Sequence, residues 1–372
     1  MDIQWSPEEL AFRDEVRAFL AEKLTPEIRR VGQLATSVYP DHEASMAWQR
    51  ILNERGWAAP HWPVEHGGCD WTMGQHYIFN RERIAAGAPS LSPMGIHMVA
   101  HVIIRFGTAA QKAYFLPRIL TGEIFFCQGY SEPGAGSDLA SLQMAAVADG
   151  DELILDGSKI WTTHATEANW IFCLVRTSNA GKPQQGITFL LVEMDSPGIE
   201  VRPILNLELH GEFCEVFFND VRVPYDSLVG GINQGWSMAK ALLGFERIFL
   251  GSPKQSTFAL QRLERLARHL GLWHDPLFVR RFAALSMDLD SHKALYERFA
   301  ERLRRGESLG PEVSMLKIFQ SELFQRISEL GLEVAGEDSA LLQPFAEDPE
   351  LHPAGIFIQS RPTTIYGGSN EI

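Results

Sequence analysis

Apolar residues recur close to a helical period through the first third of the chain. Ser6-Pro7-Glu8-Glu9 is a capping box with a proline in the first turn. Apolar positions follow at near-helical spacing at Leu10, Val16, Phe19 and Leu20. The pattern continues past the proline- and glycine-rich stretch PHWPVEHGG (60–68), and it predicts an N-terminal helical domain over residues 1–122.

The pattern changes near Glu123. Short runs rich in β-branched and aromatic residues now alternate with turn signals such as DGDE and NAGKPQQG. The runs are ELILDGSKIWTT, NWIFCLVRT, GITFLLVEM and CEVFFNDVRVP. They predict a β domain over residues 123–228.

Helical periodicity returns near Asn233 in four long amphipathic segments. They are MAKALLGFERIFL, FALQRLERLARHL, LFVRRFAALSMDLDSHKALYERFAERL and VSMLKIFQSELFQRISELGLEVAG. Four such segments are enough for a four-helix bundle, so we expect a C-terminal helical-bundle domain over residues 229–372. The order is therefore helical, β, helical, and the chain is mainly α.

Length and charge narrow the class of protein. A chain of 372 residues predicts two or three domains, and 45% hydrophobic with 22% charged residues is ordinary for a soluble globular protein. The formal net charge of −14 argues against a nucleic-acid partner, which needs a positive field, but leaves room for an anionic ligand held by a few placed groups. No apolar run approaches the roughly 20 residues that a membrane span needs, so no membrane partner is expected.

The cysteines and the N-terminus bear on location. Cys69, Cys127, Cys173 and Cys214 are scattered and form no CxxC pair, which predicts reduced structural thiols in a reducing compartment. The start MDIQWSPEEL lacks the apolar core of a secretory signal. We expect a bacterial cytoplasmic protein, or a mitochondrial matrix protein if the sequence is a mature form.

The stretch GYSEPGAGSDLASL (129–142) is the strongest single chemical signal. Gly134 and Gly136 would let the backbone come close to a ligand, and Ser131 and Ser137 offer hydroxyls beside N–H groups that suit an anion. The stretch is not a dinucleotide fingerprint, because its glycine spacing differs and no βαβ unit surrounds it. From these residues alone, a plain hairpin loop stays open as the alternative.

A second signal is DGSKIWTTHATEANW (156–170). Trp161 stands at a predicted strand end and is followed by two threonines. A tryptophan can cover a planar heterocycle, and a threonine hydroxyl can bond a ring nitrogen. A tryptophan in a β core with threonines at ordinary strand positions stays open as the alternative.

Taken together, these segments resemble the acyl-CoA dehydrogenase flavoprotein family, and the resemblance spans the whole chain. WQRILNERGWAAPHWPVEHGG (48–68) and RFGTAAQKAYFLPRILTGE (105–123) resemble its N-terminal part, and CEVFFNDVRVP (214–224) resembles the strand that leaves its β domain. The resemblance implies a mainly α fold with a central β-barrel, an N-terminal helical domain and a C-terminal four-helix bundle. It also implies FAD as the cofactor.

The resemblance also implies roles for single residues. Tyr130 and Ser131 would meet the flavin pyrimidine edge, largely through backbone, and Gly136 would belong to the FAD site. Ser137 would touch both the FAD diphosphate and the acyl-CoA. Other residues of the implied FAD site are Trp161 against the isoalloxazine, Thr163 near flavin N5, and Ser369 and Glu371 of the terminal loop. The glycine pair Gly367-Gly368 would then bring the backbone close to a large ligand.

The implied reaction is α,β-dehydrogenation of an acyl-CoA thioester to the 2-enoyl-CoA. A carboxylate removes the α-proton, and hydride passes from the β-carbon to flavin N5. Many members carry this base in the terminal loop as Tyr-Glu-Gly-Thr, but here the loop reads Tyr366-Gly367-Gly368-Ser369, so Gly367 stands in the glutamate position. Members of the isovaleryl type instead use a glutamate on the first helix of the C-terminal bundle, where this chain has Glu246.

The sequence around Glu246 suits a base. Its helical neighbours at three and four positions are all apolar: Leu242, Leu243, Phe249 and Leu250. A carboxylate on such a stripe should have a raised pKa and act as a base near neutrality. A glutamate that reaches the helix edge, or pairs with Arg247 or a distant cation, is the alternative. Arg247 matches the family's arginine near the acyl-CoA and is expected to bind substrate.

Two departures from the family pattern bear on assembly. Many members carry an Arg-x-x-Phe-Gly segment that reaches the FAD diphosphate of a neighbouring subunit, but here the region reads RHLGLWHDPLF, with Leu272 near the expected arginine. Some members that act on bulky or steroid CoA thioesters are built from two related chains. We therefore hypothesise an α2β2 heterotetramer with a paralogous chain, beside a homotetramer. The family usually continues for one more short helix past Asn370-Glu371-Ile372, so a longer natural C-terminus is also an expectation.

The sequence is compatible with three functions. The first is a dehydrogenase that passes electrons to an electron-transfer flavoprotein, and the second is a relative that uses O₂, such as an acyl-CoA oxidase. The third is a non-catalytic subunit that shapes a partner's site. No metal is expected, because His97 and His101 are four apart but have no third ligand nearby, and Asp288 with His292 is better explained by a solvated helix face. The two histidines are candidates for lining a pocket.

Overall fold

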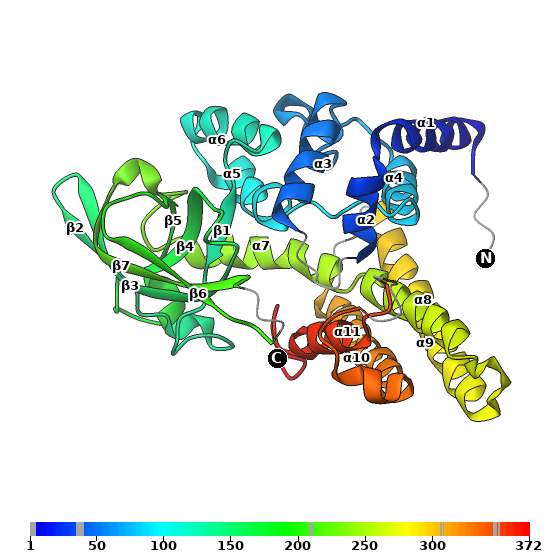
Figure 1. The fold of residues 1–372 in the computed structure, drawn as a ribbon. Helices are drawn as coiled ribbons and strands as arrows, with labels where there is room; N and C mark the ends of the chain where they lie inside the picture. The colour runs from blue at the N-terminus through cyan, green and yellow to red at the C-terminus, as the bar shows by residue number, and fades with distance from the viewer. Residues whose placement is uncertain are drawn as a thin grey trace. The chain divides into compact units, whose positions relative to one another are not determined.

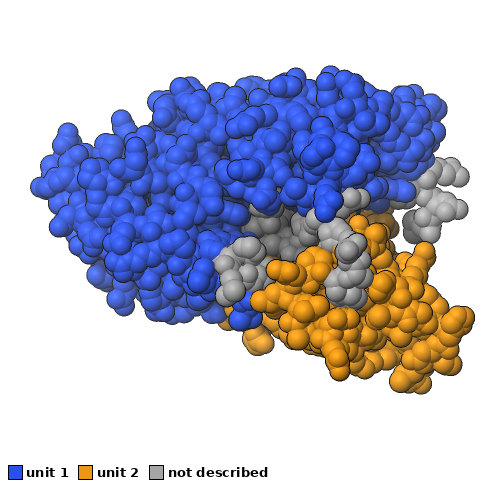
Figure 2. Space-filling model, viewed as in Figure 1, with its two compact units in different colours: residues 1–33, 39–245 blue, residues 34–38, 246–372 orange. Residues whose placement is uncertain are grey.

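The computed structural model describes residues 5–34, 41–207, 211–305, 307, 309–344, 348 and 350–372. Within them, the side chains of 33–34, 243–249 and 303–304 lie outside what is described. The chain forms two compact units, shown in Figure 2. Unit 1 comprises Met1–Gln33 and Tyr39–Phe245, and unit 2 comprises Leu34–Val38 and Glu246–Ile372.

Unit 1 begins with helices whose ends follow from the sequence. They are α1 (Pro7–Lys23), α2 (Pro26–Leu34), α3 (His42–Glu54), α4 (Met73–Ala85), α5 (Ala100–Phe106) and α6 (Ala109–Thr121), with a π-helical segment η2 (Met94–Val99) before α5 (Figure 1). The predicted capping box is confirmed: Glu9 N–H donates to Ser6 Oγ at 3.2 Å, and Ser6 N–H donates to the Glu9 carboxylate at 2.9 Å. Aromatic rings fill the core, with Trp57 in edge contact with Phe19 at 4.9 Å between centroids.

The middle of the chain forms a seven-stranded sheet. Its strands are β1 (Phe126–Gly129), β2 (Ala145–Asp149), β3 (Glu152–Thr163), β4 (Trp170–Arg176), β5 (Ile187–Glu193), β6 (Ile199–Ile204) and β7 (Phe213–Pro224). The four strand-like runs in the sequence correspond to β3, β4, β5 and β7, which confirms those predictions. The apolar face of the sheet holds Cys127, Cys173 and Cys214, and all four cysteines of the chain are free thiols.

The predicted β-barrel is wrong in one respect: the curled sheet stays open. The order is β1-β4-β2-β3-β7-β6, with β5 paired to β4, and among the described strands β6 pairs only with β7. The physical reason lies in β6, whose exposed Glu200 and Arg202 pair with each other at 2.7 Å. Charged, exposed side chains are typical of an edge strand, which they protect from further pairing.

The C-terminal helices occur where the four amphipathic segments predict them. They are α7 (Gly235–Leu250), α8 (Lys254–His269), α9 (Pro276–Arg304) and α10 (Ser314–Ala335), followed by a short α11 (Pro353–Ser360) that the pattern did not predict. In unit 2, α10 packs against α8, α9 and α11, around buried Leu263, Leu323 and Ile327. None of the helices in the described ranges is long and apolar enough to cross a membrane.

Candidate active site

The loop after β1 exposes its backbone. Glu132 and Ala135 exchange two backbone hydrogen bonds of 3.0 Å, which closes a tight turn around Pro133-Gly134. Gly134 and Gly136 are exposed, and a Cβ added at either position would meet nothing within 4 Å. Neither glycine has a positive φ, so nothing in the described chain requires a glycine at these positions. The absence of side chains at these two exposed positions leaves room for the close approach of another molecule.

A buried ion pair fixes this loop to the sheet. Lys159 in β3 is fully buried, and its Nζ donates to the Glu132 carboxylate at 2.7 Å and to the Tyr130 carbonyl at 3.3 Å. The other donors to Glu132 are the N–H groups of Gln143 at 2.6 Å and Met144 at 2.9 Å. Burial lowers the pKa of Lys159, while the Glu132 carboxylate acts in the opposite direction. Both residues lie within the two sequence motifs described above. Their contact could not be predicted from the motifs, because the two residues are 27 positions apart.

Trp161 is held in a strained conformation at the end of β3. Its φ is +60°, in the left-handed region that a bulky side chain rarely adopts, and the pairing of β3 with β7 shifts register between Lys159 and Thr162. The side chain is 58% exposed and touches Phe213 edge-on at 6.3 Å. A strained backbone that presents a large aromatic ring to solvent is a mark of a functional site. Trp161 is therefore not a residue of the β core, which was the alternative interpretation from the sequence.

The two threonines after Trp161 are buried, and one of them keeps a polar atom without a partner. Thr162 Oγ1 is fully buried and makes no hydrogen bond in the described structure, while Thr163 is 4% exposed. A buried hydroxyl without a partner is costly, which makes this segment a candidate for contact with a polar ligand. Thr162 was not singled out in the sequence, because only Thr163 matched the family motif.

The other predicted residues of this region differ in exposure. Tyr130 is buried, and its ring packs edge-on against Phe172 at 5.8 Å between centroids, so the ring belongs to the core of unit 1. Ser131 is half-buried, and its carbonyl accepts from Ile160 N–H at 2.9 Å. Ser137 is exposed. The structure thus brings the loop and the Trp161 segment together in unit 1.

The terminal loop in unit 2 is tied down by a lysine. Lys317 in α10 is 7% exposed and its Nζ donates to the Gly368 carbonyl at 2.8 Å and to Asn370 Oδ1 at 2.9 Å. Burial lowers the pKa of Lys317 to about 8. Gly367 and Gly368 have φ of +63° and +86°, so the turn itself requires glycine at both positions. This corrects the expectation that ligand approach alone explains the pair.

The remaining predicted residues of unit 2 are placed only in part. Ser369 is half-buried and hydrogen-bonds the exposed Glu371, which lowers the pKa of that carboxyl. Glu246 and Arg247 belong to α7, but their side chains lie outside the described residues. Leu242 and Leu250, one turn to either side of Glu246, are buried. Leu272, near the family's arginine position, begins a short 3₁₀ turn before α9.

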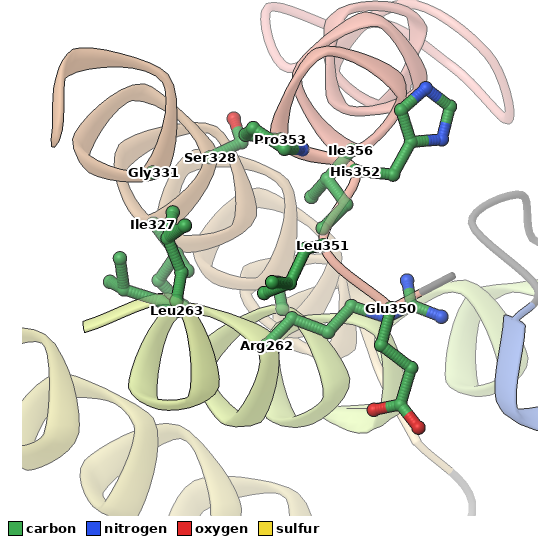
Figure 3. A pocket seen from close by; sticks show the side chains of 12 residues that line it. Arg262, Leu263, Ile327, Ser328, Gly331, Glu350, Leu351, His352, Pro353 and Ile356 are labelled. Carbon is green, nitrogen blue, oxygen red and sulfur yellow. The ribbon is translucent and has the colours of Figure 1, made fainter. Parts of the chain in front are cut away.

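A cavity in unit 2 is a competing candidate. It lies between α8, α10 and α11 and is partly open to solvent, and Figure 3 shows Leu263, Ile327 and Leu351 around it. Its polar lining includes Arg262 and Glu350. None of the residues predicted for catalysis or cofactor binding lines it. We therefore do not assign the reaction to this cavity.

Comparisons with known proteins agree with the fold and the motifs. The acyl-CoA dehydrogenase N-terminal domain matches residues 6–123, the middle domain 127–221 and the C-terminal domain 233–372. The acyl-CoA dehydrogenase IpdE1 of Mycobacterium tuberculosis is 35% identical, over 97% of this chain and 94% of that protein.

Two solved structures are also similar. The Tcur3481-Tcur3483 steroid ACAD has a TM-score of 0.85 at 30% identity, and the ChsE4-ChsE5 complex from Mycobacterium tuberculosis has a TM-score of 0.82 at 30% identity. Each comparison covers 100% of this chain and 96% of the other. The chain belongs to the acyl-CoA dehydrogenase family, a class of flavoprotein oxidoreductases that dehydrogenate acyl-CoA thioesters.

The anchoring lysine gives a stability prediction with a definite sign. The pKa of Lys317 is about 8 in the folded chain against an ordinary value of 10.5, so the unfolded chain holds more protons between these pH values. Stability therefore rises with pH across that window. We expect the free energy of unfolding of the wild type, relative to Lys317→Met, to increase by up to about 3 kcal/mol between pH 7 and pH 10. Urea unfolding of both proteins measures it, and a difference that does not change with pH would contradict the assignment.

Proposed function

We propose that this chain catalyses the FAD-dependent α,β-dehydrogenation of an acyl-CoA thioester to the 2-enoyl-CoA. The observation that carries the proposal is the strained, exposed Trp161 beside the fixed loop of unit 1. Exposed aromatic surface next to exposed backbone suits a flat heterocycle with a charged tail. We further propose the division into domains 1–122, 123–228 and 229–372, the last a four-helix bundle.

The residues fit FAD on physical grounds. Trp161 offers a ring face, Thr162 or Thr163 offers a hydroxyl, and the glycine-rich loop offers backbone N–H groups for phosphate at positions other than Glu132 and Ala135. In the same proposal, Tyr130 binds through its backbone, Gly136 gives the diphosphate close access, and Ser369 and Glu371 belong to the FAD site. The bound cofactor supplies a hydride acceptor.

We assign the base to Glu246. Removal of a weakly acidic α-proton needs a carboxylate in dry surroundings and a polarised thioester carbonyl. The buried Leu242 and Leu250 on either side support dry surroundings for this part of α7. The terminal loop offers Gly367 and Gly368, which carry no base. In the reaction Glu246 would take the α-proton, and the bound cofactor would supply the acceptor for the β-hydride, which would leave a carbon–carbon double bond. Arg247 and Ser137 bind the acyl-CoA.

Replacing the base tests this function directly. We expect Glu246→Gln to fold normally and to lose dehydrogenation of acyl-CoA by roughly 10²- to 10⁴-fold in kcat, because the amide cannot accept the proton. Glu322→Gln on α10 is the matched control, since Glu322 is exposed. Turnover with an artificial electron acceptor is the measurement. A Glu246→Gln enzyme as fast as its parent would show that the base lies elsewhere.

The physiological assembly follows from the missing arginine. Leu272 in place of a cation leaves a diphosphate without one of its expected partners, and two of the similar structures carry two-chain names, Tcur3481-Tcur3483 and ChsE4-ChsE5. We propose an α2β2 assembly with a paralogous chain, a steroid-like or other bulky acyl group, and an electron-transfer flavoprotein as acceptor. The bacterial sources of IpdE1 and of the ChsE4-ChsE5 complex favour a bacterial cytoplasm over a mitochondrial matrix.

The oligomer separates this assembly from its alternatives. We expect the purified chain alone to bind substoichiometric FAD, and co-expression with a paralogous chain to restore full binding, as measured by light scattering and flavin absorbance. A homotetramer of this chain with one FAD per subunit and full turnover would rule out the two-chain assembly. Oxygen consumption during turnover would favour the oxidase alternative. An active two-chain complex whose turnover is unchanged by Glu246→Gln would favour a non-catalytic subunit.

A further inference from the structure

A group of basic side chains in unit 1 has no role in the proposed chemistry. Arg83 of α4 is half-buried, and its guanidinium lies over the ring of Phe79 at 5.6 Å. Close enough to interact with it electrostatically are His61, from the loop before α4, and His97, from η2. His101 of α5 lies within reach of both histidines. We call these four residues the Arg83 cluster.

Arg83 carries a charge that the described protein does not balance. No carboxylate among the described residues lies within ion-pair distance of it, and its hydrogen bond goes to the neutral Asn80 Oδ1 at a long 3.4 Å. The adjacent acid, Glu82, forms an ion pair with Arg17 instead, with 2.7 Å between the Glu82 carboxylate and Arg17 Nε. Desolvation lowers the pKa of Arg83 to about 10, so it stays cationic at neutral pH. A half-buried cation without a counter-charge is less favourable than one in water, and a bound anion would supply the missing charge.

The histidines around Arg83 are neutral and do not compete for an anion. Desolvation, with Arg83 and other histidines adding to it, lowers the pKa of His61 to about 4 and that of His97 to about 3. A neutral imidazole offers one N–H donor without adding charge. The cluster therefore carries the charge of one guanidinium, which suits a group that carries a single negative charge.

The local backbone gives an independent sign of function. His97 lies in the π-helical segment Met94–Val99, which leads directly into α5 and His101. π-helical turns are rare and occur frequently at functional sites. The neighbours Ile96, Met98 and Val99 are buried, whereas His97 and His101 are only half-buried and His61 is exposed. The side chains of the Arg83 cluster are thus at least partly accessible to solvent.

We propose that the Arg83 cluster binds a carboxylate carried by the acyl part of the substrate, so that the enzyme prefers the mono-CoA thioester of a dicarboxylic acid. The proposal rests on the proposed function. Guanidinium binds carboxylate through two parallel hydrogen bonds. The phosphates of CoA are the other anions such a ligand brings, but they carry more charge than one cation balances. A carboxylate therefore matches the cluster better than a phosphate.

Binding to length-matched thioesters tests the proposal without requiring turnover. Calorimetric titration of the holoenzyme compares the affinity for suberyl-CoA with that for octanoyl-CoA. Free CoA, which has the phosphates but no acyl group, tests whether the cluster binds phosphate. We expect wild type to bind suberyl-CoA at least about 10-fold tighter than octanoyl-CoA, the gain of a charge-assisted pair. Arg83→Gln should abolish this preference, and Arg83→Lys should keep part of it. Arg81→Gln, an exposed arginine on the same helix, should leave it unchanged.

Three results would overturn the proposal. They are equal affinity of wild type for the two thioesters, a preference that survives in Arg83→Gln, and an equal loss of affinity for free CoA in that variant, which would make the cluster a phosphate site. Circular dichroism and the unfolding midpoint of Arg83→Gln show whether the variant is folded, and Arg83→Lys provides the comparison if it is not. Loss of preference with unchanged octanoyl-CoA turnover would separate this site from the dehydrogenase chemistry itself.

Discussion

The buried pair of Lys159 and Glu132 is the contact on which the candidate site in unit 1 depends. Two backbone N–H groups and one ammonium converge on the Glu132 carboxylate, and the same ammonium holds the Tyr130 carbonyl. One carboxylate therefore joins the start of the glycine-rich loop, its end and strand β3. Removing either partner would leave an uncompensated buried charge, which is far more costly than losing a surface pair. The pair positions the loop by satisfying every charge that it buries.

This arrangement explains how an exposed site keeps its shape. Trp161 is two residues beyond Lys159 on the same strand, so the anchor that fixes the loop also fixes the strained tryptophan. The strain is tolerated because β3 pairs with β7 on both sides of it. In unit 2, Lys317 similarly anchors the terminal loop, by donating hydrogen bonds to Gly368 and Asn370. In both units a buried lysine holds a backbone segment that the sequence motifs associate with the cofactor.

The sequence predicted the elements of this fold well, because hydrophobic periodicity follows local geometry. The capping box at Ser6, the strands β3, β4, β5 and β7, and the four long C-terminal helices were all predictable in this way. The open sheet was not, since closure depends on which edges pair, and the exposed charges Glu200 and Arg202 signal an edge only once β6 is known to be a strand.

Long-range contacts explain what else was missed. The pairs Glu132–Lys159 and Lys317–Asn370 join segments that are distant in the sequence. The residues around each member of a pair give no indication of which residue it contacts. The sequence suggested that Gly367 and Gly368 allow the backbone to come close to a ligand. Their positive φ angles show that the turn itself requires glycine at both positions. Unpaired Arg83 was invisible for the same reason, because a missing counter-charge is a property of the folded chain.

The central claim is that this chain oxidises an acyl-CoA through a bound flavin. Anaerobic titration of the FAD-loaded protein with acyl-CoAs, from short-chain to branched, dicarboxylic and steroid thioesters, tests it most directly, with and without a paralogous partner chain. The account predicts that at least one thioester bleaches the flavin absorbance in proportion to the amount added, and that Glu246→Gln abolishes the bleaching. An oxidised flavin that stays unchanged with every thioester, in the presence of its partner chain, would contradict the account.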